Sequence, residues 1–485
     1  MPMMSEKIKL KNQLLSFFVA VLAASIVLII PIDDFLSENG KRVIFSQQSR
    51  SLAAIFFFTL ILWSTEALPI AVTALLAIVL QPLLEVAATR DAFTAFMSPV
   101  FFFVIAMFII AGSISETRLD KRFAFFLLNK AGTKSTRIIL ALMIGTATLS
   151  SIISDVPACA VFMTIALGII NNSQIKQGQS NLAKVLMIGI PIAALIGGVA
   201  TPAGSSINVL ALDLLEVFAL QHQLDIEVTF LQWMALGVPM AMILLPLAWG
   251  ILIWVYPPEI EQIGSVTSMK IAQKLLGKLS KPELKVIIIL LIMMICWIAG
   301  SWIKPLNVAV VALLGAIIMF MPGINLITWE KAEHYIGWDA LLMIGSVTSL
   351  GQASVKTGLA EWLVQATMSG ITDWPLFWLI AFISLLTVLI HLPLPIAPVV
   401  NAVLIPPIAA LALSMGIDPV ILVLPVAFTA SCAFLLPLDA VPLITYAKGY
   451  YRMWDMLKPG IILSFAWIII MTVLMIWIAP RVQLY

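Results

Sequence analysis

Two stretches of this chain place helix-breaking residues and a lone carboxylate inside long apolar sequence. The first holds Ser154-Asp155-Val156-Pro157 and, some distance later, Ala200-Thr201-Pro202-Ala203-Gly204. The second holds Leu436-Pro437-Leu438-Asp439-Ala440-Val441-Pro442. Backbone that leaves the helical conformation at membrane depth is tolerated only where protein buries it or where it lines a cavity. Such breaks are typical of the binding site of a membrane carrier.

The composition indicates that the breaks lie within a membrane. Apolar residues make up 62% of the 485 residues, and charged residues only 11%, against roughly 25% in ordinary soluble domains. This predicts an all-α polytopic membrane protein in contact with a lipid bilayer. The near balance of 27 basic and 25 acidic residues gives no indication of a nucleic-acid partner. Cys159, Cys296 and Cys432 show no CxxC spacing and are interpreted as buried thiols.

Apolar runs long enough to cross about 30 Å of hydrocarbon predict about 11 transmembrane helices and two re-entrant helical hairpins. The predicted organisation is an N-terminal span and loop (1–51), a first unit (52–255) with a hairpin near 138–171 and a broken span near 185–212, a cytoplasmic linker (256–285), and a second unit (286–485) with a hairpin near 376–412 and a broken span near 420–446. Most of the 27 lysine and arginine residues fall in segments on the side of the N-terminus. The positive-inside rule therefore predicts a cytoplasmic N-terminus in the inner membrane.

The two units resemble each other. Thr117-Arg118-Leu119 parallels Thr357-Gly358-Leu359, Cys159-Ala160-Val161 parallels Asn401-Ala402-Val403, and Pro202 parallels Pro437. Matching loops differ in charge, since 117–137 is basic whereas 356–374 carries one lysine and two acidic residues. Opposite charge on matching loops favours inverted repeats. Inverted repeats place a binding site at their interface near the midplane of the bilayer.

Three motifs carry a resemblance to a known family. They are Trp63-Ser64-Thr65-Glu66-Ala67-Leu68-Pro69, the basic connector Thr117-Arg118-Leu119-Asp120-Lys121-Arg122, and Ser431-Cys432-Ala433-Phe434 followed by Leu436-Pro437. In this order they resemble the divalent-anion:sodium symporter family, the di- and tricarboxylate transporters of the wider ion-transporter superfamily. The resemblance covers nearly the whole chain. It implies an elevator-type movement of the hairpin-bearing part and a homodimer.

The resemblance also implies the site residues. In the family, a Ser-Asn-Thr triplet at each hairpin tip and the two broken spans hold sodium and the substrate carboxylates. Here the first triplet becomes Ser154-Asp155-Val156 and the second becomes Ile396-Ala397-Pro398. The implied substrate-binding residues are Ser154, Asp155, Val156, Thr201, Ser205, His391, Ile396, Ala397, Pro398 and Asp439. The implied sodium ligands are Ser150, Ser154, Asp155, Thr201 and Asn208. We expect one sodium site at most and no other cofactor, because the second half has lost its hydroxyl and amide ligands.

The carboxylates create an electrostatic problem. Two ionised aspartates would repel an anionic substrate in a site of low dielectric constant. A cation can neutralise Asp155, one or both acids can be protonated, or the substrate can carry less charge than a dianion. His391 titrates near neutral pH and, when protonated, could receive a substrate carboxylate.

Structural roles compete with each of these interpretations. Asp155 could instead cap the second hairpin helix, and Asp439 could cap the half-helix after the second break. His391 could simply donate a hydrogen bond to a backbone carbonyl. The serine and threonine residues near 201–206 could allow close helix packing. The sequence leaves both sets of interpretations open.

The leading functional prediction is a secondary active carrier of small organic anions such as di- or tricarboxylates, coupled to sodium, protons or counter-substrate. One alternative is a transporter of sulfate or a less charged solute on the same fold. Another is a membrane scaffold or sensor that does not transport. An enzyme is disfavoured because the chain contains neither HExxH nor GxSxG with a histidine partner.

Overall fold

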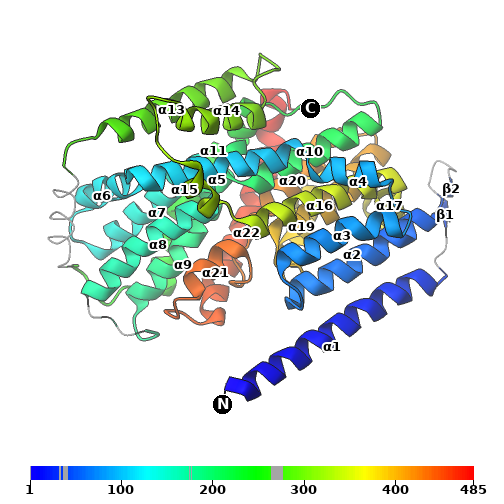
Figure 1. Ribbon diagram of the computed structural model, residues 1–485, viewed down its shortest axis with the longest axis horizontal. Helices are drawn as coiled ribbons and strands as arrows, with labels where there is room; N and C mark the ends of the chain where they lie inside the picture. The colour runs from blue at the N-terminus through cyan, green and yellow to red at the C-terminus, as the bar shows by residue number, and fades with distance from the viewer. Residues whose placement is uncertain are drawn as a thin grey trace.

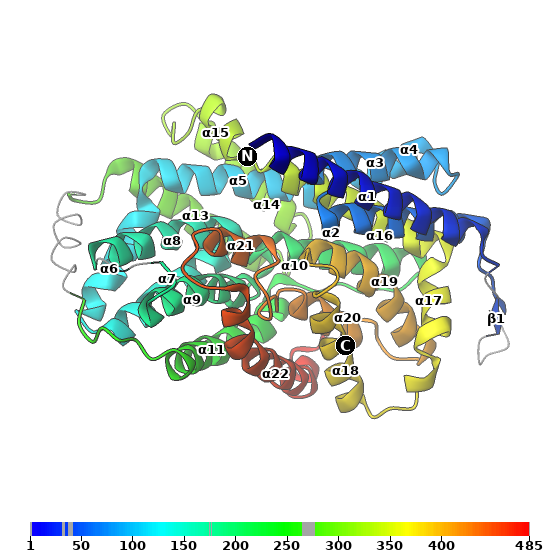
Figure 2. The same ribbon diagram turned by 90° about the horizontal axis from the view of Figure 1, so that it is seen from below.

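The computed structural model describes residues 2–31, 34–36, 42–173, 175, 177–263 and 277–484. This part of the chain is almost entirely helical, and Figures 1 and 2 show helices throughout the molecule. The exception is a pair of two-residue antiparallel strands, β1 (Phe35–Leu36) and β2 (Arg42–Val43). The predicted all-α fold is confirmed. The predicted linker 256–285 falls partly on 264–276, outside the described residues.

The helices follow the predicted order, and their bounds are given in two groups. After α1 (Pro2–Ile29), the first group is α2 (Gln47–Thr65), α3 (Ile70–Leu83), α4 (Thr89–Phe96), α5 (Pro99–Thr117), α6 (Leu119–Ala131), α7 (Ser135–Ile153), α8 (Asp155–Asn172), α9 (Asn181–Gly198), the 3-10 turn η1 (Pro202–Gly204), α10 (Ser206–Gln221) and α11 (Phe230–Val255). The second group is α13 (Lys281–Ala299), α14 (Val308–Phe320), α15 (Trp329–Tyr335), α16 (Trp338–Thr357), α17 (Leu359–Thr367), η2 (Ser369–Ile371), α18 (Leu376–Ile390), α19 (Ala397–Ser414), α20 (Val420–Thr429), α21 (Ala440–Tyr446), α22 (Met453–Trp477) and η3 (Ala479–Val482).

Within the described residues, nine helices are long and apolar enough to cross a membrane, and α3, α14, α18 and α20 are shorter apolar helices. About 11 such helices are predicted from the sequence; α2, α3, α14 and α16, at four of the predicted spans, are not among these nine, which include the hairpin helices α7, α8 and α19. The apolar runs of the sequence also did not predict the short helices α4, α6, α15 and α17. They are too short to cross a bilayer, so a search for long apolar runs does not detect them.

The order of elements in the first group recurs in the second. A short helix precedes a long one in α4–α5 and again in α15–α16, and each long helix ends at a residue in the left-handed conformation. These residues are Arg118 (φ 62°) and Gly358 (φ 79°), the aligned positions of the first paired motif. A helical hairpin, a broken span and a long closing helix then follow in both groups.

The closing helices pack against the breaks in equivalent ways. A Cβ atom on Gly237 of α11 would lie 2.3 Å from the carbonyl oxygen of Val199, and one on Gly460 of α22 would lie 2.0 Å from that of Phe434. Trp233 of α11 also donates a hydrogen bond to the Val199 carbonyl at 2.9 Å. Only glycine permits such close approach of two backbones. Each broken span is therefore held by the closing helix of its own group.

The helices form two packed bodies. In one body α5 packs on α14 and α15, while α16 packs on α2, α3 and α4. In the other, α7 packs on α9, α11 on α22, α10 on α19 and α20, and α21 on α8 and α9. The bodies meet where α10 and α19 contact α16, where α7 and α10 contact α5, and where α11 contacts α13. In Figure 2, α3 and α4 lie at one edge and α11 and α22 at the opposite edge.

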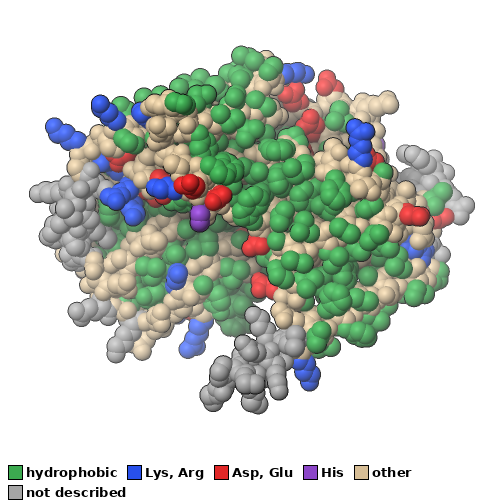
Figure 3. Space-filling model, viewed as in Figure 1, with side chains coloured by type: hydrophobic (Ala, Val, Ile, Leu, Met, Phe, Trp, Pro, Cys, Tyr) green, Lys and Arg blue, Asp and Glu red, His purple; other side chains and the backbone are tan. Residues whose placement is uncertain are grey.

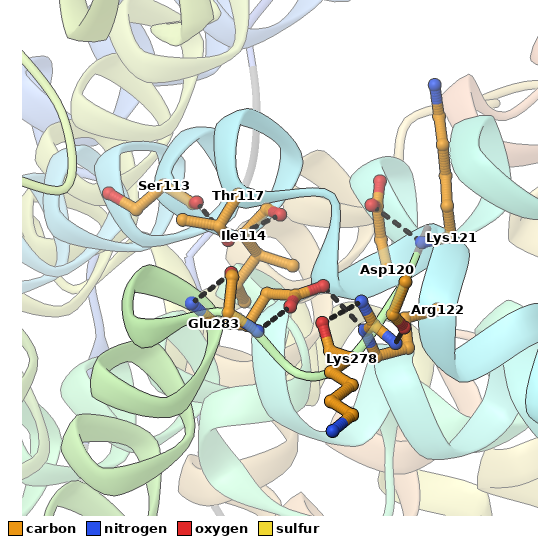
Figure 4. Close-up of polar contacts among 10 residues, drawn as sticks. Ser113, Ile114, Thr117, Asp120, Lys121, Arg122, Lys278 and Glu283 are labelled. Atoms are coloured by element: carbon orange, nitrogen blue, oxygen red, sulfur yellow. Dashed lines mark hydrogen bonds and ion pairs between the residues drawn. The ribbon is translucent and has the colours of Figure 1, made fainter. Parts of the chain in front are cut away.

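One ion pair fastens α6 to the start of α13 (Figure 4). The Nε atom of Arg122 lies 2.6 Å from Oε1 of Glu283. Arg122 also donates to the carbonyl oxygens of Gly277 and Lys278, at 3.0 and 3.2 Å. Glu283 in turn accepts from the backbone N–H of Ser280 in a capping box. The contact joins the segment before α13 to the first group of helices.

The molecular surface is broadly apolar. Figure 3 shows a wide field of hydrophobic side chains on one face, with charged side chains gathered in a few groups. Many large hydrophobic residues are exposed on α1, α13, α14 and α22. Only 6% of the apolar stretch of α1, within Lys11–Ile29, is buried against the rest of the chain. Such a surface is stable in contact with lipid or another apolar surface, and not in water.

Candidate functional site

The first hairpin turns at a single residue. Helix α7 ends at Ile153 and α8 begins at Asp155, with Ser154 between them at φ 91° and ψ 153°. A residue other than glycine rarely adopts this conformation. Pro157 explains the turn, because it lacks the N–H that would bond to the Ile153 carbonyl if α7 continued. The chain therefore reverses direction inside apolar sequence.

The Asp155 carboxylate ties the hairpin tip to the first broken span. Oδ2 accepts a hydrogen bond from the Ser205 hydroxyl at 3.0 Å. Oδ1 accepts from the Ser154 hydroxyl at 3.1 Å and from the Val156 N–H at 2.9 Å. Ser205 is the N-cap residue of α10, so two helix N-termini meet at this carboxylate. Asp155 is only 4% exposed.

The first break exposes backbone carbonyl groups that neighbouring side chains bind. The Thr201 hydroxyl donates to the Ser151 carbonyl at 2.7 Å. The Asn208 amide donates to the carbonyl oxygens of Gly198 and Thr201, at 2.8 and 2.9 Å. Its own Oδ1 is buried and has no hydrogen-bond partner among the described residues. A buried amide oxygen without a donor is a ready ligand for a cation.

Gly198 is the point around which these groups gather. A Cβ atom there would lie 3.5 Å from the Ser150 hydroxyl oxygen and 3.6 Å from the Asp155 Cβ. The Ser150 hydroxyl donates to the Ala194 carbonyl at 2.6 Å, which leaves its oxygen lone pairs free to accept. The residues predicted as sodium ligands thus lie at or beside the first break. Hydroxyl, amide, carboxylate and carbonyl oxygens suit a sodium ion, as at the broken helices of other carriers.

The second half is built differently. Six residues, 391–396, join α18 to α19. Asp439 accepts at Oδ1 from the Val441 N–H at 3.2 Å and at Oδ2 from the Ala397 N–H at 3.3 Å. It therefore caps α21 and also binds the first turn of α19, as its capping interpretation predicts. Ile396 and Pro398 flank Ala397 and supply apolar side chains. The second altered triplet therefore contacts Asp439 through the backbone N–H of Ala397.

His391 bonds to a backbone carbonyl. Its Nε2 atom lies 2.6 Å from the carbonyl oxygen of Ala430, at the end of α20. This is the hydrogen bond to a backbone carbonyl that the structural interpretation of His391 predicts. The other ring nitrogen, Nδ1, is buried without a hydrogen-bond partner among the described residues.

The structure has two hollows at the site, whereas the sequence suggests a single binding site. The first, of about 450 Å³ with its open mouth, lies beside the first hairpin tip and is lined by residues 153–157 and Ser206, with residues of α5 and α16. The second, of about 260 Å³ with its open mouth, lies beside the second hairpin tip and is lined in part by His391, Cys432 and Asp439. Helix α21, which Asp439 caps, packs on α8, which begins at Asp155. Thr201, Ser205 and Ala397 line neither hollow.

The sequence reading missed the wall opposite Asp155. This wall consists of Phe103, Val104, Met107, Phe108, Ala340 and Ile344, from α5 and α16. Their apolar side chains carry no signal that separates them from ordinary packing residues. What could have indicated this wall is that α5 and α16 occupy equivalent places in the repeated order of helices. Through this wall the first hollow lies between the two packed bodies.

The two halves also exchange equivalent contacts. Asn401 of α19 donates to the Ile207 carbonyl in the first turn of α10, at 3.0 Å. Cys159 of α8 donates to the Val441 carbonyl in the first turn of α21, at 3.6 Å. Cys159 and Asn401 are the residues that the repeat aligns. Each hairpin therefore holds the half-helix after the break in the opposite half.

Two broken spans, two hairpin tips and buried carboxylates beneath an apolar surface define a multi-pass membrane transporter with a central site. A family model described as the sodium:sulfate symporter transmembrane region matches residues 11–483, and the chain belongs to this family. This confirms the divalent-anion:sodium symporter resemblance. The protein is therefore a transporter of small anions and not an enzyme.

Individual relatives agree with the family. The sodium-dependent dicarboxylate transporter SdcS of Staphylococcus saprophyticus is 27% identical, with 97% of this chain and 92% of that protein covered. SdcS of Staphylococcus aureus strain USA300 is 27% identical over 87% of this chain and 84% of its own length. An uncharacterized transporter of Haemophilus influenzae is 26% identical, with 90% and 93% covered. Among solved structures, the YdaH transporter of Alcanivorax borkumensis is similar in fold, with a TM-score of 0.50, 14% identity, and 79% of this chain and 86% of that chain covered.

Proposed function

We propose that this protein is a secondary active carrier of di- or tricarboxylates that moves its substrate together with a sodium ion. The observation that carries the proposal is the oxygen cluster around Gly198. There the Ser150 hydroxyl and the Asp155 side chain lie beside Gly198, whose carbonyl accepts from the Asn208 amide, and the Asn208 amide oxygen has no partner among the described residues. A sodium ion bound there would neutralise Asp155 and so remove the repulsion that an anion meets in the first hollow. The dicarboxylate relatives support the substrate class.

Helix termini supply the attraction for the anion. The helices α8, α10, α19 and α21 all begin at the two hairpin tips and the two breaks. The N-terminus of a helix carries partial positive charge and unpaired N–H groups, which favour an anion. The side chains of Ser154, Ser205 and Ser206 add hydroxyl groups there. This arrangement fits a carboxylate group at each tip.

The mode of movement follows from the two bodies. We propose that 52–255 and 286–485 are inverted repeats. We further propose that the body formed by α7–α11 and α18–α22 slides against α1–α5 and α13–α16, as in an elevator. The first hollow lies between these bodies, so sliding would carry the bound anion past α5 and α16. We also propose a homodimer in the inner membrane with a cytoplasmic N-terminus, in agreement with the family resemblance and the charge of the loops.

Uptake of labelled succinate into proteoliposomes tests the proposal. An inward sodium gradient should drive accumulation above the level reached with an equal potassium gradient. Unlabelled succinate should compete better than sulfate. Asp155→Asn should raise the sodium concentration needed for half-maximal uptake by about tenfold, since the ion loses a charged ligand. Asp225→Asn, at an exposed loop position, is the matched control and should behave as the unaltered protein. Accumulation that ignores the sodium gradient, or that sulfate blocks better than succinate does, would contradict the proposal.

A further inference from the structure

The second hollow contains a histidine whose ring has one nitrogen to spare. His391 is 7% exposed and lines the hollow beside Asp439 and Cys432. The ring follows α18 directly and reaches back to the end of α20. The side chains of Ile396, Ala397 and Pro398 at the second hairpin tip offer no oxygen that could hold a cation.

The contact with Ala430 fixes the tautomer of the ring. A carbonyl oxygen accepts hydrogen bonds and cannot donate, so Nε2, 2.6 Å away, carries the proton. In the neutral ring Nδ1 is then a bare lone pair. It is buried and has no donor among the described residues. A second proton can bind the ring only at Nδ1.

The surroundings of Nδ1 keep the empty site neutral. A cationic ring buried without an acceptor is unfavourable. Asp439 is the anionic group that lines the same hollow, but its two oxygens already accept from the N–H groups of Val441 and Ala397. The Cys432 thiol lies 3.6 Å from the Ser464 hydroxyl. In the empty state the hollow therefore holds the Asp439 carboxyl group and a neutral imidazole.

The helices packed on α18 bring few other charges. Helices α19 and α20 contain no Asp, Glu, Lys, Arg or His, and the charged residues of α22, Asp455 and Lys458, lie in its first two turns. Asp155 faces the first hollow, where the proposed sodium ion would neutralise it. A carboxylate that enters the second hollow thus meets the repulsion of Asp439 and a ring that offers no N–H group.

We propose that His391 takes up a proton at Nδ1 when a substrate carboxylate enters the second hollow, so that one proton travels with the anion. The proton comes from the solution on the side of entry and binds the Nδ1 lone pair. The new N–H group then donates a hydrogen bond to the carboxylate. The proton leaves to the opposite solution when the substrate departs. This inference rests on the proposed function and adds a second coupling ion to it. The proton would supply a positive charge at a hairpin tip whose side chains at 396–398 could not hold a metal ion.

Proton movement can be measured with succinate in proteoliposomes that contain a trapped pH-sensitive dye. With equal sodium on both sides, succinate entry should acidify the lumen in step with uptake of the label. The affinity for succinate should weaken by up to tenfold per pH unit above neutrality, as expected for one linked proton. His391→Gln can still donate to Ala430 but cannot take up a proton. It should bind succinate more weakly at neutral pH, lose the acidification and lose the pH dependence of uptake.

The outcomes separate the two proposals. Sodium-driven succinate uptake without acidification, or acidification and pH dependence that persist in His391→Gln, overturns the role of His391 and leaves the carrier function standing. Absence of succinate uptake by the unaltered protein under any gradient overturns both. The measurements on the unaltered protein need no variant, so they decide the matter even if His391→Gln does not fold.

Discussion

The ion pair between Arg122 and Glu283 provides a test of how charge is distributed at the junction of α6 and α13 (Figure 4). The Glu283 side chain is 3% exposed and that of Arg122 is 21% exposed. Arg122→Gln would leave a buried carboxylate without its cation. Loss of one partner costs about 3–5 kcal/mol for a fully buried pair and about 0–1 kcal/mol for an exposed one. For this half-buried pair we expect a loss of about 2–3 kcal/mol in the free energy of unfolding.

The reverse substitution should be milder. The Gln side chain in Glu283→Gln can still accept from the Ser280 N–H, because glutamine also serves in a capping box. Arg122 keeps its contacts with the Gly277 and Lys278 carbonyls and can reach water. We therefore expect a loss of about 1 kcal/mol. The double variant should lose little more than Glu283→Gln alone, which corresponds to a coupling energy of about 2–3 kcal/mol.

Reversible unfolding in mixed detergent and SDS micelles measures these free energies. Lys121→Gln removes the same charge from the neighbouring, exposed position and should change stability by less than about 0.5 kcal/mol. In Figure 4 the Lys121 side chain points away from the ion pair. Equal losses for Arg122→Gln and Glu283→Gln, or a coupling energy below about 0.5 kcal/mol, would refute the reasoning from burial.

Three further predictions concern the site and its supports. Ser154→Gly should stabilise the protein by about 1 kcal/mol and Ser154→Val should destabilise it, because the φ of 91° suits glycine; thermal unfolding in detergent would show both signs. Gly237→Ala should abolish folding or uptake, since the added Cβ would meet the Val199 carbonyl, whereas Gly250→Ala, with open space around it, should leave both intact; equal behaviour of the two variants would count against the packing. Burial raises the pKa of Asp120 above its ordinary value of 3.8, so stability falls as pH rises from that value to the raised pKa, and the loss is complete above it; Asp120→Asn should raise the melting temperature at pH 8 and not at pH 4, and the opposite order would show the sign to be wrong.

Much of the fold could be predicted from the sequence. Helices α7–α8 and α18–α19 occupy the ranges predicted for the hairpins, and α9–α10 and α20–α21 those predicted for the broken spans. These features depend on local chemistry, since proline and aspartate interrupt apolar runs that otherwise form helices. The short helices α4, α6, α15 and α17 escaped because they lie below the length that such a search detects.

The site was predictable only in part. The oxygen ligands around Gly198 could be identified because residue type and spacing reveal them. The wall of apolar residues from α5 and α16 and the amide of Asn401 could not, because buried apolar and amide side chains look alike wherever they lie. The division into two hollows also followed from the packing of distant helices alone.

The sequence by itself determined that the chain spans a membrane, that its helices break at two points, and that each break carries an acid. These properties depend on hydrophobicity and on the backbone limits of neighbouring residues. Only the tertiary structure decided that Asp439 binds the first turn of α19, that Ala430 sets the tautomer of His391, and that each hairpin contacts the opposite half. Such contacts join atoms from residues far apart in the chain, and their directions depend on how whole helices pack.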